Sequence, residues 1–384
     1  MAENQPGSGP KNRVNHSSSF PDYAVRLRMA IGLASPSQPN VGFGEREFNQ
    51  WALELFALQF AQNPVYRRFC AARGVTPVGL ADWRQIPTIS VSAFKEGDLT
   101  SLPEGDRICV FHSSGTTGQR PSRHFHDADS LAVYEASLQG WFAPHLLPEG
   151  AARTGRVRML SLTPTPEAAP HSSLVHMLAT VGQGGRVEFL GEAGGENGWS
   201  LDGAKVFAAV EAGAATGPVM LLGTAFNFVH WLDFLTERGV RLELPAGSRI
   251  METGGYKGRS RIVPKEDLHD WMTQRLGVGP ESIICEYGMS ELSSQGYDGV
   301  AGRAQSRRRR FAFPPWARVQ VVSPETGREV AEGETGLLRI YDLANLRSVL
   351  AVQTEDLGVR RGEEFELLGR AELAEPRGCS LQSA

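Results

Sequence analysis

The sequence is poor in cysteine and in long apolar runs, and each shortage removes a class of protein. The four cysteines, Cys70, Cys109, Cys285 and Cys379, are widely scattered and form no CxxC pair, so no disulfide framework is expected. Sparse cysteines of this kind favour a reducing, cytoplasmic setting. The most apolar window, residues 219–235, is interrupted by polar residues, and we therefore expect no membrane span.

An excess of charge of one sign is also lacking. The 384 residues include 39 Lys and Arg against 43 Asp and Glu, a formal charge of −4. This balance gives no general attraction to nucleic acid or to anionic membranes, so neither is expected as a partner. The polar amino terminus lacks the apolar stretch of a secretory signal, and residues 1–44 are predicted to form a disordered or loosely ordered tail.

Helix-like and strand-like segments alternate through the middle of the chain. Apolar residues recur at spacings of three and four over 45–72, which predicts a helix. Further helices are expected over 131–142, 172–181, 204–212, 226–238 and 265–276, and strands over 156–162, 186–190, 218–222, 249–252 and 282–287. This alternation predicts an α/β fold whose mostly parallel sheet is covered by helices.

The pattern changes after residue 310. Strand-like segments over 318–322 and 336–341 flank a turn sequence, Pro324-Glu325-Thr326-Gly327, and together they indicate a β-hairpin. We therefore predict an α/β core over 45–310, a small β-subdomain over 311–370 and a flexible tail over 371–384.

The stretch between Cys109 and Asp127 carries the clearest chemical signal. An apolar segment, residues 108–111, passes abruptly into small and hydroxyl-bearing residues, and Arg120 and Arg123 follow. Glycines let the backbone approach a ligand, N–H and hydroxyl groups donate to it, and guanidinium groups suit phosphate. We interpret the run as a phosphate cradle rather than a flexible linker. Its residues are Ser113, Ser114, Gly115, Thr116, Thr117 and Gly118, and no lysine follows as in a P-loop.

Four motifs in order resemble those of the adenylate-forming superfamily, which includes acyl-CoA synthetases and luciferases. SSGTTG resembles its ATP-phosphate loop, EYGMSE at 286–291 its YGxTE motif, and TED at 354–356 its TGD motif. Gly369-Arg370 resembles the arginine before the interdomain hinge of that superfamily. Two further stretches, TGGYKG at 253–258 and EPRGCSL at 375–381, resemble the acyl-protein synthetase branch of LuxE type, which is related to phenylacetate-CoA ligases.

The resemblance implies a site for ATP and Mg²⁺. Glu291 would hold Mg²⁺, Tyr287 would border the adenine, and Asp356 would accept hydrogen bonds from the ribose. Lys257 would approach a carboxylate or the α-phosphate. The other nucleotide-site residues that the resemblance implies are Arg123, Gly288, Ser290 and Arg370.

Each assignment has a plainer alternative. Glu291 could cap a helix that begins after Ser290, Tyr287 could be an ordinary strand-end aromatic, and Asp356 a turn residue. Lys257 could be a solvated loop lysine. The aromatic region 222–235 could line an acyl pocket through Gly223, Ala225 and Phe226, although core packing explains most of it.

Two further clusters, one of arginines and one of histidines, could in principle bind ligands. The run Arg307–Arg310 is interpreted as a solvated loop near the nucleotide rather than a nucleic-acid site. His124 and His126 straddle Phe125 and are expected on one strand face. Without a third ligand they make no metal site, but either could help Arg123 to neutralise phosphate.

The carboxy terminus departs from the typical acyl-CoA synthetase. Those enzymes continue past the hinge into a mobile lid domain, whereas this sequence stops five residues after Cys379, so we expect the C-terminal lid domain to be absent. A thiol beside an activated acyl group can form a thioester, and Arg377 would favour its thiolate. Cys379 is therefore assigned as the acyl acceptor, with an incidental terminal thiol as the alternative.

We therefore predict an ATP-dependent acyl-protein synthetase. It would convert a fatty or related carboxylic acid to acyl-AMP, load the acyl group on Cys379 and pass it to a partner protein, a reductase or a carrier. An acyl- or aryl-CoA ligase is the first alternative. A non-catalytic nucleotide- or acyl-binding subunit of a multi-enzyme complex is the second.

Overall fold

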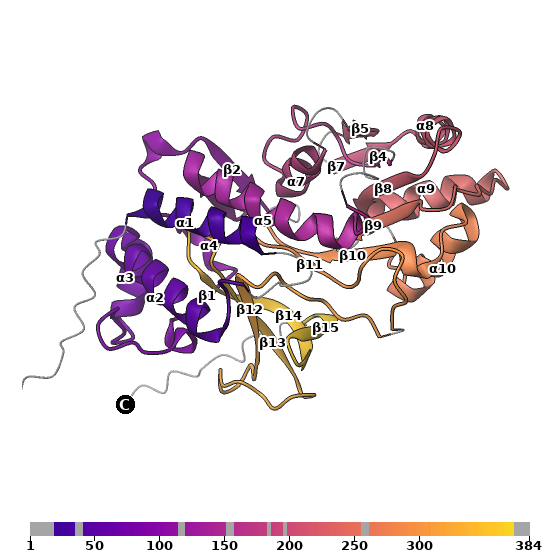
Figure 1. Ribbon diagram of the computed structural model, residues 1–384. Helices are drawn as coiled ribbons and strands as arrows, with labels where there is room; N and C mark the ends of the chain where they lie inside the picture. Colours follow the sequence, from indigo (N-terminus) through magenta and orange to yellow (C-terminus); the bar gives the residue numbers. More distant parts are fainter. Residues whose placement is uncertain are drawn as a thin grey trace, which may run out of the picture.

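The computed structural model describes eight stretches of the chain, and every structural statement below concerns them. They are residues 19–34, 41–113, 120–150, 157–182, 186–194, 198–254, 261–306 and 308–371. Two larger sheets organise this part of the chain, with helices packed around them (Figure 1).

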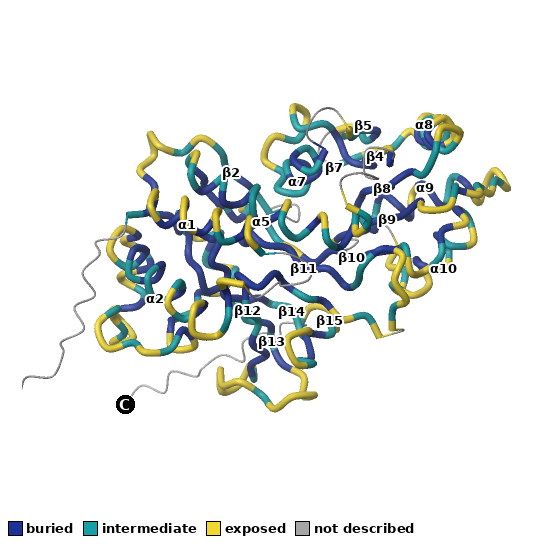
Figure 2. The backbone as a smooth tube through the Cα atoms, in the orientation of Figure 1, coloured by how far each residue is buried: buried dark blue, intermediate teal, exposed yellow. Residues whose placement is uncertain are grey.

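The larger sheet has six strands, and five adjacent strands in it run parallel to one another. In spatial order they are β5 (Val187–Phe189), β4 (Arg158–Ser161), β8 (Val219–Thr224), β9 (Arg249–Thr253), β10 (Ile283–Tyr287) and the antiparallel edge strand β11 (Gly296–Tyr297). The central strands are buried along their whole length, as parallel strands covered on both faces are (Figure 2). The predicted α/β class is confirmed.

Helices cover both faces of this sheet because successive strand residues point to opposite sides. Leu221 and Ile250 pack in one apolar cluster, and their neighbours Met220 and Met251 pack in another. The first cluster includes residues of α8 (Gly203–Ala214), α9 (Ala225–Glu237) and α10 (Lys265–Leu276). The second includes residues of α5 (Ala128–Leu146) and α7 (Ser173–Val181).

The second sheet confirms the predicted hairpin, since β12 (Ala317–Val322) and β13 (Thr335–Asp342) pair antiparallel. β14 (Ala351–Arg361) pairs with β13, and β15 (Glu364–Arg370) and the short β1 (Ile89–Ser90) pair with β14. This sheet shares an apolar core with the amino-terminal helices α1 (Phe20–Leu33), α2 (Glu45–Gln62), α3 (Pro64–Ala71) and α4 (Ala93–Glu96).

Two predictions for the amino-terminal region are wrong in part. Residues 20–33 form helix α1 instead of a loose tail, because Ser19 caps the helix and its apolar side chains, such as Tyr23 and Leu27, are buried. The predicted helix over 45–72 breaks at Asn63, whose side chain accepts a hydrogen bond from the Tyr66 N–H at 3.0 Å and caps a second helix. The domain boundaries remain a prediction, although the shared core joins residues on both sides of them.

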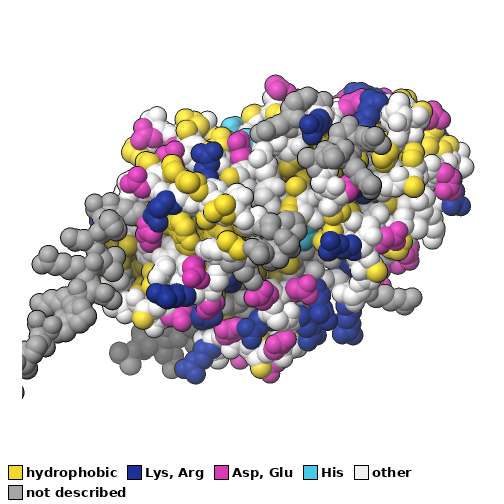
Figure 3. All heavy atoms as spheres, in the orientation of Figure 1, with side chains coloured by type: hydrophobic (Ala, Val, Ile, Leu, Met, Phe, Trp, Pro, Cys, Tyr) yellow, Lys and Arg dark blue, Asp and Glu magenta, His cyan; other side chains and the backbone are white. Residues whose placement is uncertain are grey.

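Acidic and basic side chains are interspersed on the face drawn in Figure 3. Within the basic run, Arg309 is largely buried, and its guanidinium donates to the Ile283 carbonyl at 2.9 Å and lies 3.5 Å from Asp298. The interpretation of the run as solvated is therefore wrong for Arg309, whereas Arg308 and Arg310 are exposed as expected and Arg307 lies outside the described residues. No helix in the described part of the chain has both the length and the apolar character needed to cross a membrane.

A buried ionic cluster fastens helix α10 to the larger sheet. The Glu252 carboxylate on β9 is fully buried and accepts from Lys265 Nζ at 2.9 Å and from His269 Nε2 at 3.1 Å. These contacts and burial have opposite effects on the pKa of Glu252, and the contacts hold it well below its usual value. The carboxylate therefore stays charged and depends on its partners.

We expect Lys265→Met to lower the free energy of unfolding by roughly 3 kcal/mol, because it leaves a buried carboxylate without its ammonium partner. Urea unfolding measures the change. A matched control is Arg241→Met, whose ion pair with Glu243 is exposed and whose loss should cost less than about 1 kcal/mol. Equal effects of the two substitutions would contradict the structural role of the cluster.

Candidate functional site

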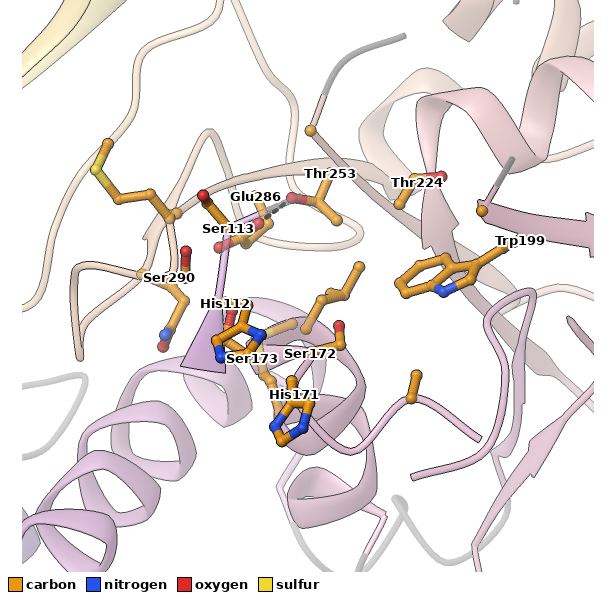
Figure 4. A pocket seen from close by; sticks show the side chains of 18 of the residues that line it. His112, Ser113, His171, Ser172, Ser173, Trp199, Thr224, Thr253, Glu286 and Ser290 are labelled. Atoms are coloured by element: carbon orange, nitrogen blue, oxygen red, sulfur yellow. Dashed lines mark hydrogen bonds between the residues drawn. The ribbon is translucent and has the colours of Figure 1, made fainter. Parts of the chain in front are cut away.

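A cavity of about 520 Å³ opens at the carboxyl ends of the parallel strands. Thr224, Thr253 and Glu286 line it from the ends of β8, β9 and β10, in the position where open α/β sheets bind ligands. Figure 4 shows Trp199 facing this group from β7 (Gly198–Leu201), across the cavity. The wall also contains apolar side chains, including Leu174 and Met177.

The predicted phosphate cradle begins at this cavity. Strands β2 (Cys109–His112) and β3 (Arg123–His126) pair antiparallel, and Ser113 at the end of β2 lines the cavity. The Ser122 N–H donates to Ser113 Oγ at 3.0 Å, which holds the two ends of the connection together. Several predicted residues lie outside the described part of the chain: Ser114, Gly115, Thr116, Thr117, Gly118, Lys257 and Cys379.

Strand β3 brings this hairpin against the second nucleotide motif. The imidazole Nδ1 of His124 lies 2.9 Å from the Ser290 carbonyl oxygen, and burial lowers the pKa of His124 to about 4. His124 and His126 share one strand face as expected, with ring centroids 4.4 Å apart. A buried neutral imidazole supplies no cation, so the suggestion that these histidines help to neutralise phosphate is wrong.

Arg123 already has an ion-pair partner. Its guanidinium lies 2.7 Å from Asp98, which also pairs with Arg107 at 2.7 Å. Arg123 is not among the described residues that line the cavity. Its role toward phosphate therefore stays a prediction.

Three predicted nucleotide residues meet in a second group beside the cavity. The Tyr287 hydroxyl donates to Asp356 Oδ2 at 2.7 Å, and Arg370 Nε lies 3.6 Å from Asp356 Oδ1. The Tyr287 ring packs edge-on against Phe311, Phe313 and Phe365, with ring centroids 5.6–6.0 Å apart. Burial raises the pKa of Asp356, while the Tyr287 hydrogen bond and the charge of Arg370 oppose that rise.

Between the two groups lies the segment with Gly288, Ser290 and Glu291. Gly288 and Ser290 line the cavity, and the Ser290 hydroxyl donates to the buried Glu291 carboxylate at 3.3 Å. A turn, not a helix, occupies this position, so the helix-capping alternative for Glu291 is wrong. The described residues contain no cluster of three metal-binding side chains, and Mg²⁺ at Glu291 would depend on phosphate oxygens and water for its other ligands.

The buried carboxyl of Glu286 was not among the predicted site residues. Its side chain lines the cavity and accepts a hydrogen bond from the Thr253 hydroxyl, drawn in Figure 4. Burial, reinforced by the nearby Glu252 carboxylate, raises the pKa of Glu286 to about 7 despite that hydrogen bond. A strand residue next to Tyr287 must point to the opposite face, and this alternation was the available signal.

Two further lining residues were also missed, His112 and His171. Their rings stack with centroids 4.5 Å apart, and the His112 N–H donates to the His171 backbone carbonyl at 2.9 Å. Of the weaker acyl-pocket candidates, Phe226 lines the cavity, whereas Gly223 packs against Leu162 and Ala225 lies in the core. No sequence pattern set the two histidines apart from core residues.

The raised pKa of Glu286 predicts a pH-dependent stability difference. Between its ordinary value of 4.5 and about 7 the folded chain keeps a proton that the unfolded chain loses, so this group's contribution falls as the pH rises. Glu286→Gln removes the effect. Relative to the unchanged protein, the variant should gain roughly 3 kcal/mol between pH 4 and pH 8 by urea unfolding. A stability difference that does not change with pH would contradict the buried, proton-holding carboxyl.

Known proteins are similar to this chain over much of its length. The family model for acyl-protein synthetase, LuxE, matches residues 201–383. A long-chain-fatty-acid–luciferin-component ligase of Vibrio harveyi is 21% identical over 344 residues, 85% of this chain and 84% of the relative. The protein of the same name from Aliivibrio fischeri is 30% identical over 180 residues, 43% of this chain and 45% of the relative.

Solved structures with a similar fold are ligases. An open conformation of 2-hydroxyisobutyryl-CoA ligase, in complex with 2-HIB-AMP and CoA, superimposes with a TM-score of 0.63 at 12% identity, over 85% of this chain and 69% of that one. The same enzyme in the postadenylation state superimposes with a TM-score of 0.62 at 13% identity, over 96% of this chain and 74% of that one. At this identity the likeness concerns the fold, which is that of adenylate-forming ligases.

Proposed function

We propose that this chain is an acyl-protein synthetase of LuxE type, which uses ATP to activate a fatty or related carboxylic acid and transfers the acyl group to a thiol. The proposal is supported by the spatial proximity of residues from three motifs that are far apart in the sequence. Ser113, Ser290 and the Tyr287–Asp356 pair come from three distant motifs, yet they lie around the carboxyl end of β10.

The chemistry requires two anions in one place. A carboxylate oxygen attacks the α-phosphorus of ATP, the bond to the bridging oxygen breaks, and pyrophosphate leaves. Asp356, held by Tyr287, is suited to accept hydrogen bonds from ribose hydroxyls, and Ser113 and the following hydroxyl-rich segment to donate to phosphate. Glu291 would hold Mg²⁺, which neutralises phosphate charge, and Lys257 is proposed to approach the carboxylate or the α-phosphate.

A thiolate then attacks the acyl carbon of the mixed anhydride, and AMP leaves as the thioester forms. We assign this step to Cys379. Among the cysteines in the described residues, Cys70 and Cys285 are buried, and burial raises the pKa of Cys109 to about 11. These thiols are poor nucleophiles at neutral pH, which supports Cys379 as the acceptor. A second protein would take the acyl group from Cys379.

The nucleotide assignment predicts a loss of ATP binding in Asp356→Ala. Loss of hydrogen bonds to a charged acceptor should raise the KM for ATP by roughly tenfold to a hundredfold in acid-dependent ATP–pyrophosphate exchange. Glu243→Gln, at an exposed surface pair, is the matched control and should leave the KM unchanged. An unchanged KM in Asp356→Ala would remove Asp356 from the nucleotide site.

The acceptor assignment predicts a split phenotype in Cys379→Ser. The variant should still catalyse ATP–pyrophosphate exchange but should retain no label from radioactive acid after denaturing gel electrophoresis. Cys109→Ser is the control and should retain label like the unchanged protein, because a thiol with a pKa of about 11 is almost fully protonated at pH 7. Label retained by Cys379→Ser at the unchanged level would show that another group accepts the acyl chain.

A further inference from the structure

We propose that Glu286 is a specificity-determining residue for the acid, and that it selects acids whose acyl portion carries a hydrogen-bond donor, a hydroxyl or an amino group. This inference rests on the proposed function. It concerns the substrate class and assigns Glu286 no part in the bond-making steps.

The alternation of side chains along β10 separates Glu286 from the nucleotide group. Tyr287 points toward Asp356 and the aromatic rings that belong to the core of the small sheet. Glu286, its neighbour in the strand, points to the other face, where Tyr134 and Met177 also line the cavity. A ligand group that meets Glu286 therefore lies on the side away from Asp356, where the acyl portion of an acid would lie if the nucleoside occupies the Tyr287 side.

Two cavity-lining side chains, Glu286 and Gln295, offer hydrogen-bond acceptors. Among the described residues, the Thr253 hydroxyl is the donor to the Glu286 carboxyl, and no Lys or Arg lines the cavity. Gln295 lines the same wall, is 5% exposed, and its Oε1 has no hydrogen-bond partner in the described part of the chain. Two buried acceptors that line one cavity favour a ligand that brings a donor to them.

The absence of a side chain at Gly288 leaves room for the Glu286 carboxyl at the cavity wall. A Cβ atom at Gly288 would lie 2.3 Å from Glu286 Oε1 and 3.6 Å from Gln295 Cγ. The residue after Tyr287 is therefore small where the carboxyl and the amide approach each other. Both side chains therefore reach the cavity wall next to Gly288.

The wall around these acceptors suits a mainly apolar acid with one polar substituent. Leu174, Met177, Trp199 and Phe226 provide apolar surface for an alkyl or aryl portion. An unsubstituted chain over Glu286 would remove water from the carboxyl without replacing its hydrogen bonds, which costs free energy. Sites built around a polar substituent discriminate strongly against analogues that lack it.

The test is acid-dependent ATP–pyrophosphate exchange with matched acids of several chain lengths. Each acid is tested without a substituent and with either a hydroxyl or an amino group. The substituent is placed at the second, third or terminal carbon. The unchanged protein should favour one substituted series over the plain acids by roughly a hundredfold or more in kcat/KM. Glu286→Leu should lower this ratio of kcat/KM values to about tenfold or less, because the leucine side chain does not accept a hydrogen bond.

An isosteric variant separates the two donors. At pH 8, above its pKa of about 7, Glu286 is charged and accepts hydrogen bonds. Glu286→Gln retains an acceptor oxygen without charge, so at this pH the preference for a hydroxylated acid should survive, whereas preference for a protonated amine should be lost. Glu188→Gln, at an exposed ion pair on β5, is the control and should leave all ratios unchanged.

The outcomes distinguish this inference from the proposed function. Plain acids that support exchange as well as their substituted counterparts, or a ratio that Glu286→Leu leaves unchanged, would overturn the role of Glu286 and leave acid activation intact. If no acid in the panel supports exchange with the unchanged protein or with any variant, the proposed function is overturned and this inference with it.

Discussion

The alternation of side chains at the carboxyl end of β10 is the constraint on which the site depends. Glu286 and Tyr287 are adjacent in sequence, yet they serve two different surroundings because a strand directs neighbours to opposite faces. One face meets the small sheet through Asp356, and the other meets the cavity under α5 and α7. A single strand end therefore connects the side proposed for the nucleoside with the side proposed for the acid.

A buried aspartate holds the next part of the chain in place. Asp342, at the end of β13, accepts hydrogen bonds from the Ser293 and Ser294 N–H groups at 2.9 and 2.8 Å and from the Ser294 hydroxyl at 2.7 Å. Burial raises the pKa of Asp342 to about 6, although these hydrogen bonds favour its charged form. The contact ties the segment after the nucleotide motif to the second sheet, so the two sheets jointly position Ser290 and Glu291.

The parts of the fold with strong periodicity could be predicted from the sequence, and the parts set by long-range contact could not. The helix expected over 265–276 is α10, and the strand expected over 249–252 is β9 within one residue. The helix α1 was overlooked because its apolar positions follow a polar segment. Strand alternation places Glu286 on the face opposite to Tyr287, but its burial beside Thr253 and Gly288 depends on contacts distant in sequence.

The core shared by the two ends of the chain has a consequence for biosynthesis. β1 pairs in parallel with β14, and the Gln59 side chain accepts a hydrogen bond from the Leu350 N–H across 291 residues of sequence. On the ribosome, the aromatic residues of α1 to α3 emerge long before the strands that cover them. The nascent chain thus carries uncovered apolar surface until the strands of the second sheet have been synthesised, a state that invites aggregation and slow, late closure of the structure.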